Sequence, residues 1–272
     1  MKKLQLSAIA FVLTNVAAGS AMAQTTPAQS WAGASVDVKA GYASFMPKIG
    51  NGGVTNANRF LVPSAAPPGY AIIPANTQYA TTTADASNLN TATAAVEVGY
   101  NFAVDQDKLL GLGLTYYTGA TGSGNGTLNP TSNGGTAFPQ VNVNYQLKNL
   151  WAISLTPGYA LDKDRLVYGK VGYTGVTIGA SGSSAPSTLG PLGGGSSVSY
   201  QTVTLSGFNL GLGYKQIITG SLYMLGEVNY ASFGNKNATI GLTNATAGGP
   251  NSLNASFGGS GYNFLVGAGY RF

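Results

Sequence analysis

Residues 262–272 decide the fold of this chain: Tyr262-Asn263-Phe264-Leu265-Val266-Gly267-Ala268-Gly269-Tyr270-Arg271-Phe272. Side chains alternate between the two faces of a β-strand, so all even-numbered positions of this stretch share one face. That face is apolar and has aromatic residues at both ends, whereas the odd-numbered face is mostly small or polar. A soluble sandwich would bury the apolar face. An apolar face bounded by aromatics, opposite a polar face, is typical instead of a transmembrane β-barrel strand.

The same alternation recurs in seven upstream segments, at residues 34–45, 92–102, 110–116, 139–159, 167–173, 202–214 and 222–230. Short polar turns alternate with long stretches rich in Gly, Ser, Thr and Asn, which we expect to be loops at residues 46–91, 118–136, 178–200 and 234–254. The pattern predicts an all-β fold, an eight-stranded antiparallel up-and-down transmembrane β-barrel with short periplasmic turns and long extracellular loops.

Residues 139–159 leave two interpretations open. Their odd-numbered positions stay mostly apolar throughout, which favours one long strand whose upper part stands above the membrane. A hairpin turning at Lys148-Asn149 is the alternative. It would make nine strands, whereas bacterial barrels of this kind have even numbers, so we expect one strand.

Aromatic residues mark both ends of the expected membrane spans. Counted from the short turns or from Trp31, the far aromatics lie about 9–11 residues away, the length that a tilted membrane strand needs. One predicted girdle contains Tyr42, Tyr116, Tyr173 and Tyr230, and the other contains Tyr100, Phe102, Tyr159 and Tyr214.

The N-terminus has the features of an export signal. Lys2 and Lys3 precede a short apolar segment, and Ala21-Met22-Ala23 forms an A-x-A cleavage site. We therefore expect residues 1–23 to be a cleaved signal peptide and residues 24–272 to form the outer-membrane barrel.

Composition excludes several function classes. Only 8% of the residues are charged, and the formal charge of +5 includes the two lysines of the expected signal, so nucleic-acid binding is not expected. The chain has neither cysteine nor histidine, which removes thiol chemistry, imidazole bases and histidine metal sites. We expect a non-enzymatic protein without a cofactor.

Four charged residues are predicted to face the lumen at a similar height: Lys39, Glu97, Lys170 and Glu227. The interior of an eight-stranded barrel is just wide enough for side chains to fill, and unpaired buried charges are costly. We expect these charges to pair and plug the lumen, with Tyr168 and Tyr223 adding bulk. A water-filled pocket solvated by the same charges is the alternative.

Two D-x-D pairs, Asp105/Asp107 and Asp162/Asp164, have the spacing found at the start of calcium loops. Both lack the glycine and the distant glutamate of such loops, and both fall in expected tight turns, where Asp is favoured for its backbone hydrogen bonds. We expect no metal site.

Several short motifs resemble the small outer-membrane β-barrel family, the opacity-protein-like group that is similar to the membrane domain of outer-membrane protein A. They are Trp31-Ala32-Gly33, Gly41-Tyr42, Gly99-Tyr100-Asn101-Phe102, Leu110-Gly111, Pro157-Gly158-Tyr159-Ala160, Leu166-Val167-Tyr168-Gly169, Gly226-Glu227-Val228 and Gly269-Tyr270-Arg271-Phe272. The resemblance covers nearly all expected strands and none of the loops. Thr156 departs from it, standing where an arginine is common.

The resemblance implies insertion by the barrel-assembly machinery, which reads the C-terminal strand; the matching residues here are Tyr262, Phe264, Val266, Tyr270 and Phe272. It also implies a role as a structural envelope protein, adhesin or surface antigen in a Gram-negative outer membrane. Outer-membrane lipid and lipopolysaccharide are the expected partners, with host or surface ligands as further candidates at the hydroxyl- and amide-rich loops. A narrow channel or porin for small solutes is the alternative function, and an outer-membrane enzyme is disfavoured by the missing histidine.

Overall fold

The computed structural model describes residues 26–63, 69–118, 122–132, 140–184, 196–244 and 251–272. The expected signal peptide, residues 1–23, lies outside these ranges. In the described part of the chain, no helix is long and apolar enough to cross a membrane.

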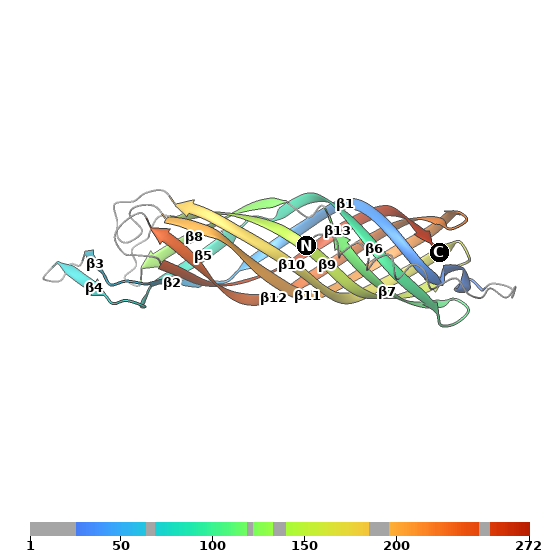
Figure 1. Cartoon of the computed structure of the whole chain (residues 1–272), viewed down its shortest axis with the longest axis horizontal. Helices are drawn as coiled ribbons and strands as arrows, with labels where there is room; N and C mark the ends of the chain where they lie inside the picture. Colours follow the sequence, from blue (N-terminus) through green and yellow to red (C-terminus); the bar gives the residue numbers. More distant parts are fainter. Residues whose placement is uncertain (1–25, 64–68, 119–121, 133–139, 185–195, 245–250) are drawn as a thin grey trace, which may run out of the picture.

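Eight antiparallel strands close into a ring, in the order β1-β6-β7-β9-β10-β11-β12-β13, and β13 pairs with β1 (Figure 1). The strands are β1 (Gly33–Ile49), β6 (Leu89–Ala103), β7 (Lys108–Tyr117), β9 (Val141–Ala160), β10 (Arg165–Ser184), β11 (Ser196–Thr219), β12 (Leu222–Asn244) and β13 (Asn251–Arg271). The predicted eight-stranded up-and-down barrel is confirmed.

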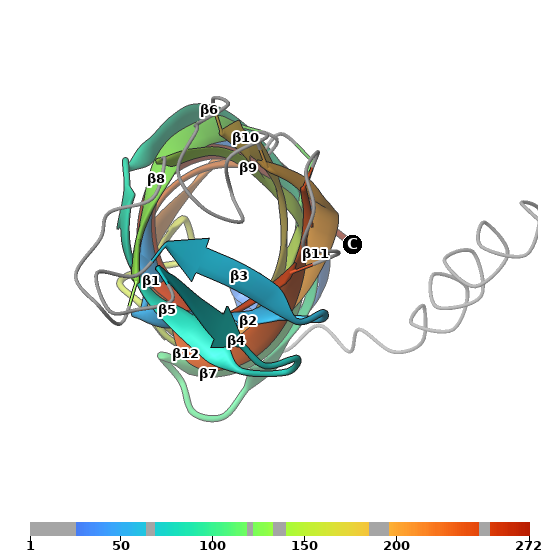
Figure 2. The ribbon, with the colours of Figure 1, turned by 90° about the vertical axis from the view of Figure 1, so that its left-hand side faces the viewer.

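Three further strands continue the barrel beyond this ring. They are β2 (Gly52–Asn56), β5 (Gln78–Ala86) and β8 (Ser123–Ser132). Along the chain, β2 follows β1, β5 precedes β6, and β8 follows β7. The pairings run β13-β2-β5-β8-β9, so these strands replace β1, β6 and β7 toward the loop end and close a second ring of eight with β9–β13. Figure 2 looks down this ring from the loop end. A hairpin of β3 (Phe60–Pro63) and β4 (Tyr70–Ile73) projects beyond it.

The four loops predicted from the sequence are therefore longer than the loops in the structure. Most described residues of 46–91, 118–136, 178–200 and 234–254 lie in strands. Their Ser-, Thr- and Gly-rich composition gave a weak strand pattern, but each segment continues a membrane strand whose neighbours offer backbone partners. Pairing across the ring stabilises sequences that local propensity leaves undecided.

Residues 141–160 form one continuous strand, so the hairpin alternative at Lys148-Asn149 was wrong. Asn149 has a positive φ of 51°, and Asn149 and Leu150 together lie opposite the single residue Val176. This β-bulge shifts the alternation by one residue. The constant phase assumed for this strand was therefore also wrong: Ile153 and Leu155 point outward, whereas Val143 and Tyr145 point inward.

The two halves of the barrel have opposite polarity. We call the half built by β1, β6, β7 and the turn-end parts of β9–β13 the membrane barrel. Large apolar side chains cover its outside; Leu112, for example, is 52% exposed. In the half built by β2, β5, β8 and the loop-end parts of β9–β13, here called the loop-end barrel, the outside is polar. Its outward side chains include Asn142, Asn144, Gln146, Thr202, Thr204, Thr239 and Asn254. Its inside is an apolar core that includes Val143, Leu205, Ile240 and Leu253.

Candidate functional site: the closed lumen of the membrane barrel

Four charged side chains from four strands meet at the centre of the membrane barrel: Lys39 on β1, Glu97 on β6, Lys170 on β10 and Glu227 on β12. Lys39 Nζ lies 2.6 Å from Glu97 Oε2 and 2.8 Å from Glu227 Oε2. Lys170 Nζ lies 2.6 Å from Glu97 Oε2 and 3.3 Å from Glu227 Oε1. Each lysine thus contacts both glutamates, and this central cluster has no net formal charge. The structure brings together the four residues that the alternation pattern placed in the lumen.

Two hydroxyl groups complete the central cluster. Thr115 Oγ1 donates a hydrogen bond of 2.7 Å to Glu97 Oε2, and Tyr168 OH donates one of 2.6 Å to Glu227 Oε1. All four charged side chains are buried, with 6% or less of each residue exposed. Buried ion pairs persist where further hydrogen bonds satisfy the remaining polar atoms, as they do here.

A second ion pair lies nearer the turn end of the lumen. Lys215 Nζ lies 3.0 Å from Asp37 Oδ2, and Tyr223 OH donates a hydrogen bond to Asp37 Oδ1. The Lys215 ammonium also lies 4.8 Å from the centre of the Tyr223 ring and 5.4 Å from that of Tyr168, within range of cation–π attraction.

Asp37 and Lys215 were not among the charges predicted from the sequence to pair in the lumen. The signal was available: Lys215 has the same parity as the inward Asn209, Gly211 and Gly213 of its strand. Tyr168 and Tyr223, expected only as bulk, donate hydrogen bonds to two of the lumenal carboxylate groups, those of Glu227 and Asp37.

An apolar layer closes the turn end of the lumen. A short 3-10 helix, η1 (Gln29–Trp31), lies at this end, anchored by a hydrogen bond from Ala28 N to Gln106 O. Trp31 is buried and packs edge-on against Tyr223, with ring centres 5.6 Å apart. The layer consists of Ala28, Trp31, Leu109, Ala160, Leu166, Tyr168, Tyr223 and Leu225. In the sequence, Trp31 served only as the point from which a membrane span was counted. In the structure it caps the lumen.

On the loop side of the central cluster, amide groups fill the lumen. Asn209 Nδ2 donates to Ser154 Oγ at 3.0 Å, and Asn229 Nδ2 donates to Asn263 Oδ1 at 2.9 Å. Apolar layer, second ion pair, central cluster and amide layer thus follow one another along the lumen. Together they occupy the membrane barrel with side chains, as its small diameter allows.

The aspartates of the short turns bond to their own loops. Asp105 Oδ1 accepts a hydrogen bond of 2.8 Å from Gln106 N, and Asp162 Oδ1 accepts one of 2.8 Å from Asp164 N. The side chain of Arg165 also donates to Asp162, which lowers the pKa of that carboxyl group. These contacts are those of turn residues. The described residues contain no group of three or more His, Cys, Asp or Glu able to hold a metal ion.

The outer face carries the predicted aromatics. Seven of the eight girdle residues are exposed, namely Tyr42, Tyr116, Tyr173, Tyr230, Phe102, Tyr159 and Tyr214. Tyr100 is half-buried because its ring packs against Phe102, with centres 4.6 Å apart. The terminal residues Tyr262, Phe264, Val266, Tyr270 and Phe272 are all exposed on the same outer face. An apolar surface of this extent marks contact with a membrane or a partner.

A closed ring of eight strands, apolar outside and plugged by polar side chains inside, defines a small β-barrel of the outer-membrane type. No protein-family model matches the sequence, and no curated protein matches it.

Solved structures with a similar arrangement include three outer-membrane proteins. OprG from Pseudomonas aeruginosa is 15% identical, with a TM-score of 0.43, over 89% of this chain and 96% of that one. The protease OmpT from Escherichia coli is 13% identical, with a TM-score of 0.47, over 87% and 97%. Ail, the attachment invasion locus protein of Yersinia pestis, is 11% identical, with a TM-score of 0.34, over 89% and 99%. Likeness at this level says nothing about function, so the assignment of fold rests on the ring itself.

Proposed function

We propose that this chain is a non-enzymatic integral protein of a bacterial outer membrane. In this role a sealed barrel contributes to envelope integrity and holds a rigid β-structure above the membrane. The central cluster carries the proposal. Four charges from four strands pair across the lumen with no net formal charge, and opening a path would separate buried ion pairs.

Bilayer reconstitution of the refolded mature chain tests the seal. We expect no steady single-channel current, together with the heat-modifiable gel mobility of a folded barrel. Large, steady, ohmic currents from protein with that mobility would overturn the proposal. Protein without the mobility shift would show that the barrel had not folded, and the recording would be repeated on folded material.

The outer surface supports the proposed location. Apolar residues and aromatic girdles suit contact with outer-membrane lipid and lipopolysaccharide, and the exposed alternation ending at Phe272 suits recognition by the barrel-assembly machinery. Export would use residues 1–23 as a cleaved signal peptide. Mass spectrometry of the mature protein should find Gln24 at its N-terminus.

The loop-end barrel supports a surface-display role as an adhesin or antigen. Its outer strands present hydroxyl and amide groups, including those of Asn142, Asn144 and Thr204, which can form hydrogen bonds with glycans or host surfaces. A deletion strain should lose detergent resistance or surface binding, and no change in either property would count against the role.

A narrow channel is the second candidate, favoured by one cavity. A polar void of about 20 Å³, enough for one water molecule, lies beside Glu97 and Lys215. If this void were connected to similar voids, they would together form a thin water path past the central cluster. Liposome swelling with small solutes separates the candidates, because only a channel permits swelling.

A further inference from the structure

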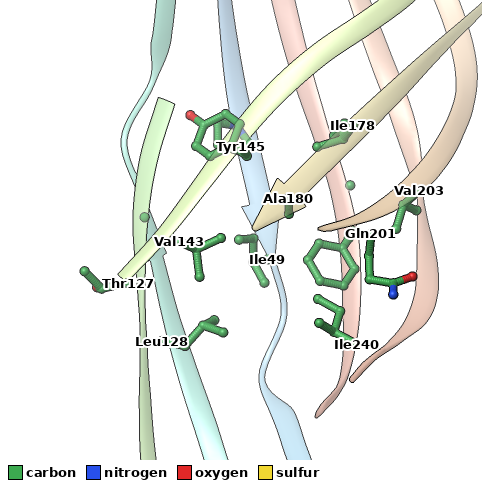
Figure 3. Close-up of a pocket in the computed structure, with 14 residues that line it drawn as sticks. Ile49, Thr127, Leu128, Val143, Tyr145, Ile178, Ala180, Gln201, Val203 and Ile240 are labelled. Carbon is green, nitrogen blue, oxygen red and sulfur yellow. The ribbon is translucent and has the colours of Figure 1, made fainter. Parts of the chain in front are cut away.

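The loop-end barrel contains an apolar pocket that the sealed lumen does not explain. Figure 3 shows Ile49, Val143, Ile178 and Ile240 pointing into it from β1, β9, β10 and β12. These strands lie around the whole ring, so the pocket occupies the interior of the loop-end barrel and is not a groove between two neighbouring strands. It lies beyond the amide layer from the central cluster.

The pocket has no charged residue in its lining. Three of its lining side chains carry polar groups, those of Thr127, Tyr145 and Gln201. Tyr145 OH donates a hydrogen bond to Ser87 O, so this hydroxyl already has a partner. The remaining lining is aliphatic, glycine or the ring of Phe257, which makes solvation of an ion or a sugar unfavourable.

The pocket is small, and Gln201, an exposed residue, lies at its edge. Its volume is about 40 Å³, enough to hold water molecules by size, but a water molecule in a cavity needs two to four polar partners. Apolar cavities of this kind stay dry and take apolar ligands. At about 40 Å³ the pocket is far smaller than the roughly 150 Å³ of an apolar cavity that binds benzene, so a narrow chain end fits it better than a ring.

We propose that the pocket binds the end of an unbranched, uncharged hydrocarbon chain, with the Gln201 amide placed to hydrogen-bond a terminal hydroxyl group. The chain can come from a free medium-chain alcohol or from a lipid. The proposal does not depend on whether the lumen of the membrane barrel conducts, because the pocket lies outside that segment.

Isoleucine methyl NMR tests the proposal on the mature protein in nanodiscs, with 1-octanol as the probe. Ile49, Ile178 and Ile240 report on the pocket, Ile217 on the turn-end layer and Ile153 on the lipid face. We expect saturable shift changes at the three pocket methyl groups. Ile153 should shift without saturation, as octanol partitions into the bilayer, and Ile217 should not respond.

Protonated and deuterated lipids separate the two sources. Contacts between lipid chains and Ile240, seen before any octanol is added, would identify a lipid as the occupant. Saturable octanol shifts without such contacts would identify a free ligand. If the pocket methyl groups showed neither lipid contacts nor saturation, the proposal would be wrong.

Ala180→Leu provides the matched variant, because Ala180 lines the pocket and the added atoms would fill it. We expect it to reduce octanol affinity at least tenfold while keeping the heat-modifiable mobility. Ser181→Leu adds a leucine at the next position, which points outward, and should leave affinity unchanged. If Ala180→Leu does not fold, Val203→Leu serves as a smaller filling of the same pocket, with the same expected direction.

Discussion

Lys39 and Glu227 lie on β1 and β12, which are not neighbours in the ring, yet Lys39 Nζ lies 2.8 Å from Glu227 Oε2. The contact bypasses β13, which lies between the two strands along the wall. Such a pair ties non-adjacent strands together and takes up the space through which a solute would pass.

Replacing Lys39 with methionine keeps the bulk of the side chain and removes its charge. Two buried glutamates would then share Lys170 alone, so we expect a loss of about 3–5 kcal/mol in the free energy of unfolding, the usual cost of breaking a buried pair. Urea unfolding in lipid vesicles measures it. Lys108→Met, at the exposed start of β7, is the matched control and should change little. Equal stability of the two variants would contradict the paired cluster.

Tyr223→Phe removes the hydroxyl that bonds to Asp37 and lies 3.3 Å from Lys215 Nζ. Asp37 would lose a donor in a buried site, and we expect a cost of about 1–3 kcal/mol in the free energy of unfolding. Tyr230→Phe makes the same change on the exposed outer face and should have little effect. Unfolding curves of the two variants, compared with the parent protein, give the answer.

The turn that holds Asp162 should make a pH-dependent contribution to stability. Hydrogen bonding from the Arg165 side chain lowers the pKa of Asp162 in the folded protein. A carboxyl group with a lowered pKa stabilises the fold above its unfolded-state pKa, and this stabilisation is lost as the pH falls through the folded-state value. The difference in unfolding free energy between the parent protein and Asp162→Asn should therefore be largest near neutral pH and shrink in acid. A difference that grew in acid would contradict the sign.

The change of surface polarity between the two barrel halves predicts where a charge is tolerated. Leu112 and Thr204 both point outward, but Leu112 lies on the apolar surface and Thr204 on the polar one. Leu112→Arg should cost about 2–4 kcal/mol, the penalty for arginine near the bilayer midplane, whereas Thr204→Arg should cost little. Folding yields in lipid vesicles test both. Similar penalties would place the membrane boundary elsewhere.

Phe272→Ala separates assembly from stability. Phe272 is 64% exposed, and its ring contacts that of Tyr270 with centres 5.1 Å apart. If the terminal aromatic is part of an assembly signal, the variant should refold in vitro like the parent protein but reach the outer membrane several-fold less in cells. Fractionation and heat-modifiable mobility report the two properties. Equal loss in both would instead indicate a purely structural role.

Residue alternation was enough to locate all eight membrane strands and four lumenal charges, because a strand's period of two is local and both faces of a membrane barrel have strict chemistry. The same alternation did not reveal the strands of the loop-end barrel. There Thr, Ser, Asn and Gly cover the outside and leave a weak strand signal, and their pairing depends on neighbours far away in the sequence. The bulge at Asn149–Leu150 also reversed the phase of β9, so the apolar residues beyond it changed faces.

The sequence by itself determined which side chains meet lipid and which enter the lumen, since parity along a strand assigns the face. Only the tertiary structure decided which lumenal groups touch. Asp37 and Lys215 are far apart in the chain, and closure of the ring places their side chains 3.0 Å apart. The same closure makes the loop-end segments a second barrel with an apolar interior, because β13 and β9 supply the edges onto which β2 and β8 pair, and β5 joins β2 to β8.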